Sequence, residues 1–463
     1  MDDVKNEIRT KAPTPGEVIP FTFPPFEHFQ LASGLEVYLA SIDRGPLVSL
    51  HLACPGGAWH DLPGEAGRAA LVAELLDEGT EDFSAMEIAA RVDRLGGFLS
   101  SQADWNASWL SIGLLSQHLV EGLELLAHIV EKATFPEAEI ERLRQQRLAT
   151  LQTRTSQPSA LAADAVAGAL YPGTAYGQSL LGTSESVKVL DRNGLLGFYD
   201  QHFNPRGSSL IVTGDLDLVA TTAAIESAFG GWAGGEPPIA APISGRSREE
   251  TRVIVVDRAE AAQTTLRIAH PSVPRTHPDF ASLQVLNSLL GGKFTSRINL
   301  ILREELGITY GASSSFSSRL GPGPFQVAAD VETVGVGIGT EKIFAELHRL
   351  QDERVGEEEL QDTKTYLLGV FPYSLQRIEG LASRLADLGV ASLPDDYFDR
   401  QLEIVRNLEP MAIQSLARQH LQPTCMTIVA VGPADQLEPQ LERFGPIAIV
   451  APNEVLAAGS DHT

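Results

Sequence analysis

The chain has 463 residues, of which 43% are hydrophobic and 21% charged, the balance of a globular protein with ample material for a core. Its 35 basic and 60 acidic side chains give a formal net charge of −25, which argues against nucleic acid as a partner. The same charge favours cationic ligands such as basic peptides, or it serves solubility alone.

The first 20 residues are expected to form an N-terminal extension, and they lack the apolar stretch of a signal peptide. No apolar run approaches the ~18 residues that would cross a membrane. Two cysteines, Cys54 and Cys425, exclude a disulfide framework and are expected to be buried free thiols. We therefore expect a soluble protein of the cytoplasm, although a matured periplasmic chain would have the same features.

Residues 21–233 form the first predicted domain. Alternation of apolar and polar residues indicates strands, and apolar residues three or four positions apart indicate helices. The expected elements, in chain order, are the strands Leu35–Ala40 and Val48–Ala53, the helices Glu65–Asp77 and Pro136–Thr153, and the closing strand Ser209–Thr213.

A second domain, residues 251–455, repeats the first after a Pro- and Gly-rich linker at 234–250. The segment QHFNPRGSSLIVTGDLD at 201–217 recurs as QHLQPTCMTIVAVGPAD at 419–435, an offset of 419 − 201 = 218. LHLACPG at 50–56 likewise recurs as LRIAHPS at 266–272, an offset of 216. The repeated His202 and His420 each precede a proline after a helical segment, and we interpret both as structural.

The elements of the second domain are the strands Arg252–Val256 and Thr265–Ala269, the helix Phe280–Leu290, a helix end at Asn299–Leu306, and the strands Ile308–Phe316 and Thr427–Val431. Gly307 is expected to end its helix in a left-handed conformation. Gly321–Pro324 reads as a hairpin loop. Strands and helices mix without a strict βαβ rhythm, so we predict the α+β class, with two homologous halves that each form a mixed sheet covered by helices.

LASGLEVYLA at 31–40 is similar to L-x-N-G-L-x-V, the opening strand of the pitrilysin/insulinase/processing-peptidase superfamily. GRAALVAELLDEGT at 67–80 resembles its zinc helix, G-L-A-H-x-x-E-H-x-x-x-x-G-T. LNSLLGGKFTSRINLILREELGITYGASSSF at 286–316 is very similar to its C-terminal signature, L-G-G-x-F-x-S-R-L-x-x-x-L-R-E-x-x-G-x-x-Y-G. The resemblance implies that the two halves form one half of a clamshell.

The zinc motif is degenerate. In the register of the resemblance, Ala70 replaces the first histidine ligand, Ala73 the catalytic glutamate and Glu74 the second histidine. Thr150 aligns with the third ligand, a glutamate of a later helix. Two imidazoles at i and i+4 share a zinc ion and the glutamate between them takes a proton from its water, and alanine can do neither. We expect no metal or cofactor in this chain, and interpret the acidic face of this helix as solvated rather than as a site for a hard cation.

The best candidates for a functional role are Arg303 and Tyr310, at the arginine and tyrosine of the C-terminal signature. The resemblance implies that they hold the peptide backbone and stabilise the tetrahedral oxyanion at a partner's zinc. A turn at Gly307 is expected to bring Arg303 near the Tyr310 hydroxyl, with Tyr310 on the same side of its strand as Ala312. In the alternative, Arg303 pairs with a neighbouring glutamate and Tyr310 packs in a sheet.

The resemblance thus implies a non-catalytic subunit of a heterodimeric metallopeptidase, inactive alone, whose homologous partner carries the zinc. Basic or unfolded peptides are the expected substrates. Two alternatives stay open: a structural subunit, like the zinc-less core proteins of a respiratory complex, and a peptide-binding homodimer without chemistry. The loop at 321–324 resembles, less specifically, the glycine-rich loop through which a non-catalytic subunit admits substrate.

Overall fold

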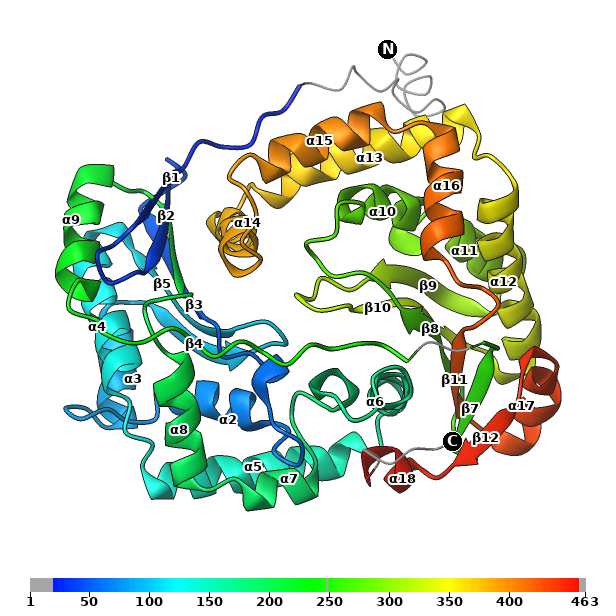
Figure 1. Ribbon diagram of the computed structural model, residues 1–463, viewed down its shortest axis with the longest axis horizontal. Helices are drawn as coiled ribbons and strands as arrows, with labels where there is room; N and C mark the ends of the chain where they lie inside the picture. Colours follow the sequence, from blue (N-terminus) through cyan, green and yellow to red (C-terminus); the bar gives the residue numbers. More distant parts are fainter. Residues whose placement is uncertain (1–19, 247–248, 458–463) are drawn as a thin grey trace, which may run out of the picture.

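The computed structural model describes residues 20–246 and 249–457, so almost all of the expected extension at 1–20 lies outside the described residues. Within them the chain forms two six-stranded mixed sheets, each covered by helices, as predicted (Figure 1). No helix of the described ranges combines the length and the apolar character needed to cross a membrane.

The first sheet has the strand order β1-β2-β6-β3-β5-β4. Its strands are β1 (Glu27–Gln30), β2 (Glu36–Ser41), β3 (Leu47–Cys54), β4 (Phe98–Ala103), β5 (Ser108–Leu115) and β6 (Ser209–Gly214). The pair β2 and β6 is parallel and the other neighbours are antiparallel. The closing strand β6 is central and buried at every position, which explains its unbroken apolar pattern.

The second sheet has the order β12-β7-β11-β8-β10-β9. Its strands are β7 (Arg252–Asp257), β8 (Thr264–Pro271), β9 (Thr309–Phe316), β10 (Pro324–Val331), β11 (Thr427–Gly432) and β12 (Ile447–Val450). From the second position onward, the two sheets have the same order and strand directions, and β2 and β7 begin 252 − 36 = 216 residues apart. The repeat seen in the sequence is therefore a repeat of topology.

The helices of the first half are α2 (Arg68–Leu75), α3 (Ala85–Arg94), α4 (Leu119–Lys132), α5 (Glu137–Arg154), α6 (Pro158–Leu170), α7 (Ser184–Val189), α8 (Arg192–His202) and α9 (Leu218–Phe229). Those of the second half are α10 (Phe280–Asn287), α11 (Arg297–Asn299), α12 (Val336–Asp352), α13 (Glu357–Ser374), α14 (Ile378–Val390), α15 (Tyr397–Asn407), α16 (Pro410–His420), α17 (Ala434–Leu441) and α18 (Pro452–Ala457). Helix α2 is shorter than predicted because Gly67, with φ +88, lies in the left-handed region and precedes its first turn.

The halves exchange one helix each. Helix α6 packs against β8 and β11 of the second sheet, and α14 packs against β3 and β6 of the first (Figure 1). Leu161 and Val166 thereby join a buried cluster with Val429, and Leu381 and Leu385 join one with Ile211. Each fully buried leucine contributes roughly 2 kcal/mol. The exchange therefore holds the two halves against one another.

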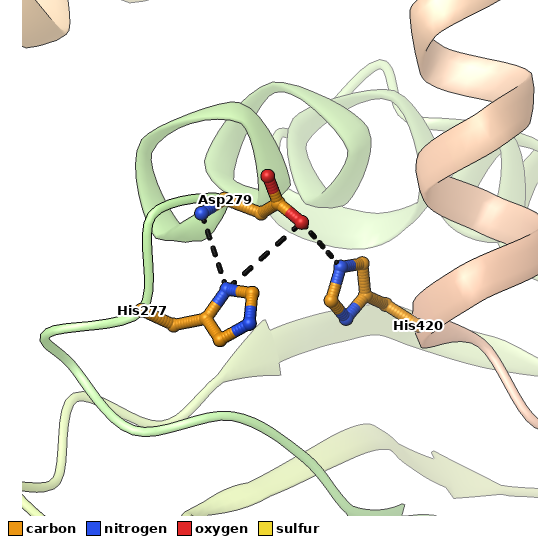
Figure 2. A group of neighbouring side chains, drawn as sticks. All are labelled: His277, Asp279 and His420. Carbon is orange, nitrogen blue, oxygen red and sulfur yellow. Dashed lines mark hydrogen bonds and ion pairs between the residues drawn. The ribbon is translucent and has the colours of Figure 1, made fainter.

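The repeated histidines end helices, as predicted: His202 is the last residue of α8. His420 is the last residue of α16 (Figure 2). Both are buried, with 2% and 7% of their surface exposed. Of the two cysteines, Cys54 is buried and free as expected. The prediction for Cys425 is wrong, because it is half-exposed in the turn after α16, where its thiol contacts Gln422.

Candidate functional site

Helix α2 occupies the place of the zinc helix and is packed as a core element. Ala70 is 6% exposed and Ala73 is fully buried, and neither side chain has an atom that can bind a metal. The helix packs against β4 and α8. The residues present therefore do not fit the zinc of the motif, and the family's hydrolytic step cannot be assigned to this helix.

Glu74, the remaining candidate ligand, is already paired. Its Oε2 lies 2.6 Å from Nη2 of Arg147, whose side chain is only 4% exposed, while that of Glu74 is 36% exposed. The contact is an ion pair rather than an aligned hydrogen bond, because Nη2 has no hydrogen-bond partner. The Arg147 Nη1 contacts the carbonyl oxygen of Leu181 at 3.4 Å. An ion pair thus occupies the position at which the motif would require a ligand.

The other acidic residues after α2 are also engaged. The Ser101 hydroxyl donates to Asp77 at 2.6 Å, and Arg142 pairs with Glu78 at 2.5 Å. Burial raises the pKa of both carboxyl groups above the usual range. The acidic face was expected to be solvated, and this expectation is wrong: Asp77 and Glu78 are only partly exposed and are paired within the chain.

From the sequence, no role was predicted for Arg147, and Thr150 was instead aligned with the third ligand. Thr150 is exposed on α5, and its hydroxyl donates to the carbonyl oxygen of Gln146 in its own helix at 3.0 Å. Arg147 lies one helical turn earlier and faces α2. The available signal was its spacing from Ile140 and Leu143, since positions 140, 143, 147 and 151 form the buried stripe of α5.

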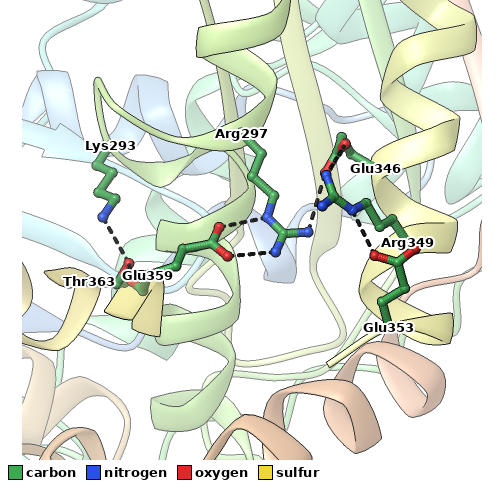
Figure 3. A network of polar contacts seen from close by, with 7 residues as sticks. All are labelled: Lys293, Arg297, Glu346, Arg349, Glu353, Glu359 and Thr363. Carbon is green, nitrogen blue, oxygen red and sulfur yellow. Dashed lines mark hydrogen bonds and ion pairs between the residues drawn. The ribbon is translucent and has the colours of Figure 1, made fainter. Parts of the chain in front are cut away.

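The C-terminal signature is anchored by a polar network (Figure 3). Arg297 donates from Nε and Nη2 to the two carboxylate oxygens of Glu359, both at 2.7 Å, and from Nη1 to Glu346 at 3.3 Å. Lys293 donates to the Thr363 hydroxyl at 2.8 Å. Because Glu346 belongs to α12 and Glu359 to α13, Arg297 fixes the segment after it against two long helices.

That segment, Leu300–Glu305, is a π-helical turn and carries Arg303. The N–H of Leu306 donates to the Ile301 carbonyl five residues earlier, at 2.9 Å. Gly307 then ends the helix with φ +65, which confirms the predicted left-handed stop. Such turns are frequent at functional sites because they reposition side chains relative to a regular helix.

Arg303 has few partners of its own. Its guanidinium lies over the Phe294 ring at 4.2 Å, and its Nε is 3.6 Å from Glu304. Nη1 is buried and has no hydrogen-bond partner. The Arg303 side chain as a whole is 33% exposed, so it is accessible in part from outside the chain, whereas Nη1 itself is not.

Tyr310 points away from the sheet, which corrects the expected strand pattern. Strand β9 pairs Thr309 with Val331 and Ala312 with Ala329, so Tyr310 and Gly311 both face Asp330 in a β-bulge. The extra residue reverses the alternation: Thr309 is buried, and Tyr310 is 91% exposed rather than on the side of Ala312. The turn at Gly307 was expected to bring Arg303 near the Tyr310 hydroxyl, but no hydrogen bond connects the two side chains in the described structure.

The predicted hairpin loop connects β9 and β10 and touches the first half. Asn106 donates to the Ser318 carbonyl at 3.1 Å and accepts from the N–H of Leu320 at 2.9 Å. Arg319 lies over the rings of Trp105 and Tyr176, at 4.2 and 4.6 Å. The loop therefore braces the two halves.

Comparisons with known proteins agree with this architecture. The chain is 23% identical to an "Uncharacterized zinc protease" of Rickettsia bellii over 88% of this chain and 98% of that one, and 22% identical to the "Non-peptidase homolog YmxG" of Helicobacter pylori over 83% and 89%. A crystal structure of a peptidase M16 inactive domain from Pseudomonas fluorescens superposes with a TM-score of 0.80 at 24% identity, covering 88% of this chain and 98% of that one. A protease from Helicobacter pylori superposes at 0.83 and 18%, covering 89% and 100%.

Sequence models of two domains match the chain. Residues 37–184 match the insulinase (peptidase family M16) domain, and residues 190–367 match the peptidase M16 inactive domain. The first match covers β2 to β5 with helices α2 to α6. The second match begins just before α8, includes β6, and contains the signature that carries Arg303 and Tyr310. The chain therefore belongs to peptidase family M16, the insulinase family.

Proposed function

We propose that this chain is a non-catalytic subunit of a heterodimeric M16 metallopeptidase, in which Arg303 and Tyr310 act on a peptide held at the zinc of a homologous partner. The observation that carries the proposal is a contrast between the halves. The first half has alanine at a ligand position and at the general-base position of the zinc motif, whereas the second half keeps Arg303, 33% exposed, and Tyr310, 91% exposed, at the arginine and tyrosine of the signature.

The residues of the first half support the proposal that this chain does not hydrolyse peptides by itself. A hydrolytic site of this family type needs three metal ligands and a general base. Ala70 and Ala73 supply neither, and Glu74 is held by Arg147 at 2.6 Å. The name of one relative, a non-peptidase homolog, points the same way.

The second half supports a role in binding a developing oxyanion. Arg303 offers a charged guanidinium on a side chain that is 33% exposed, and Tyr310 offers a phenolic hydroxyl on a side chain that is 91% exposed. Donors of this kind stabilise negative charge when they are fixed before the reaction begins. The Arg297 network and the bulge at Tyr310 hold the backbone that carries these two donors on either side of Gly307.

Peptide binding is supported by the sheet edges. Strand β4 is one of the two edge strands of the first sheet, and β9 is one of the two edge strands of the second, so each pairs with a neighbouring strand on one side only. An extended peptide adds to such an edge through main-chain hydrogen bonds. The net charge of −25 favours basic segments, so basic or unfolded peptides are the proposed substrates. The two halves of this chain are proposed to form one half of a clamshell, which the partner closes.

The test is hydrolysis of a basic, unfolded peptide by this chain with zinc supplied, by an H-x-x-E-H-bearing homologue, and by their mixture. The mixture is repeated with Arg303→Ala and with Tyr310→Phe. Tyr373→Phe serves as a matched control, since Tyr373 is also an exposed tyrosine, at 70%. We expect no hydrolysis by this chain alone, activity on mixing, and a loss of about 100-fold in kcat for Tyr310→Phe, the scale of one oxyanion donor.

Assembly is measured separately by sedimentation, so that a defect in pairing is not mistaken for a defect in catalysis. Tight pairing with unchanged kcat in both variants would favour the structural subunit. Pairing of this chain only with itself, together with peptide binding, would favour the homodimer.

A further inference from the structure

We propose that His277, Asp279 and His420 form a binding site for one divalent transition-metal ion, Zn²⁺ in particular, in the second half of the chain. Figure 2 shows the three side chains converging from two elements. Nε2 of His420 lies 2.8 Å from Oδ2 of Asp279, and Nδ1 of His277 lies 3.9 Å from the same oxygen. These three ligand atoms all lie within 4.8 Å of one another, and among the described residues no other group of this kind occurs.

The backbone around the site is fixed. His277 and Asp279 lie in the turn before α10, where the N–H of His277 donates to the Pro274 carbonyl at 3.0 Å and the N–H of Phe280 to the His277 carbonyl at 2.9 Å. His420 ends α16 and is buried. The donors therefore differ from a metal geometry by side-chain rotations alone, since ligand atoms around a tetrahedral zinc are about 3.3 Å apart.

The donor atoms have the right chemistry. Nδ1 of His277 accepts the N–H of Asp279 at 3.1 Å, so this nitrogen is unprotonated, and a metal ion would replace that N–H at its single lone pair. The Asp279 carboxylate makes no capping bond to α10 and is directed at His420 instead. Two imidazoles and a carboxylate suit zinc or a similar ion rather than Mg²⁺ or Ca²⁺, and they leave a fourth position for water. The side chains of His277 and Asp279 are 30% and 33% exposed, so that position is accessible.

The first half contains a built-in comparison. His60 and His202 correspond to His277 and His420, at offsets of 217 and 218, and their rings lie 4.3 Å apart. Asp61, 218 residues before Asp279, turns away and accepts the N–H groups of Gly67 and Ala69 at 2.9 and 2.8 Å. The guanidinium of Arg68 donates to the His60 carbonyl in its place. The first half thus has the Arg68 guanidinium where the second half has the Asp279 carboxylate, so only the second half attracts a metal ion.

The experiment is a calorimetric titration of the metal-free chain with Zn²⁺, and a parallel titration with Mg²⁺. We expect one zinc site, no comparable Mg²⁺ binding, and a loss of about tenfold or more in zinc affinity for both His277→Ala and Asp279→Asn. His60→Ala is the matched control and should retain the wild-type affinity. Circular dichroism of the metal-free variants checks that each is folded.

A second readout uses Co²⁺, whose visible absorption reports imidazole-bound tetrahedral geometry. The absorption should appear with the wild type and with His60→Ala, and it should disappear with Asp279→Asn. Zinc binding that is equally strong in Asp279→Asn and His277→Ala, or that is lost in His60→Ala, would overturn the proposal. Because the chain is titrated alone, the result is independent of the proposed heterodimer.

Discussion

The ion pair in the place of the zinc site should be a measurable source of stability. Glu74→Ala leaves the Arg147 guanidinium, 4% exposed, without its counter-charge. Removal of one partner of a fully buried pair costs roughly 3–5 kcal/mol, and the 36% exposure of Glu74 reduces the expected loss to about 2 kcal/mol in the free energy of unfolding. Replacement of both partners, Glu74→Ala with Arg147→Met, should restore stability to within about 1 kcal/mol, because the buried charge is then gone.

The assay is urea unfolding of the wild type, both single variants and the double variant, followed by circular dichroism. Glu353→Ala is the control, since its partner Arg349 is 54% exposed and the expected loss for such a helical pair is only about 0.4 kcal/mol. The reasoning is refuted if Glu74→Ala costs no more than this control, or if the effects of Glu74→Ala and Arg147→Met simply add.

Two further predictions concern pH and backbone conformation. Burial, with the neighbouring His60 contributing, lowers the pKa of His202 from 6.5 to about 3. The unfolded chain therefore binds a proton that the folded chain excludes, and the free energy of unfolding decreases as the pH drops below 6.5. In urea unfolding, the wild type should lose about 2 kcal/mol more of this free energy than His202→Asn between pH 7 and pH 5. Equal losses in the two proteins would contradict this prediction. Gly307→Ala places a side chain at φ +65 and should lower the free energy of unfolding by about 1 kcal/mol. Gly197→Ala, in a helix with open space around it, should instead raise the melting temperature. Unchanged stability of Gly307→Ala would show that the turn relaxes.

Much of the fold was predictable from local patterns. The seven strands that were predicted, β2, β3, β6, β7, β8, β9 and β11, were placed to within two residues at each end, because their apolar periodicity coincides with burial on the sheets. No bounds were predicted for the other five. The duplication was visible in sequence because the buried strands β6 and β11 retain similar residues. The exchange of α6 and α14 was not predicted, since an apolar helix face does not indicate which sheet it will cover.

The candidate site was predictable only in part. The resemblance to the family's zinc helix placed Ala70, Ala73 and Glu74 at the positions of the motif. The partner of Glu74 depends on how α5 is rotated against α2, which no local sequence pattern indicates. The bulge at Tyr310 was missed because an extra residue in one strand is defined by its partner, β10. The group at His277 joins residues 143 positions apart, 420 − 277, and only the packing of α16 beside α10 brings them together.

The most direct test of the proposed function is the rate of peptide hydrolysis by a fixed amount of zinc-bearing homologue as this chain is added. The account predicts no hydrolysis without the homologue, a rate that saturates at one chain per homologue, and a plateau about 100-fold lower with Tyr310→Phe. Metal-dependent hydrolysis by this chain alone, or the same plateau with Tyr310→Phe as with the wild type, would contradict it.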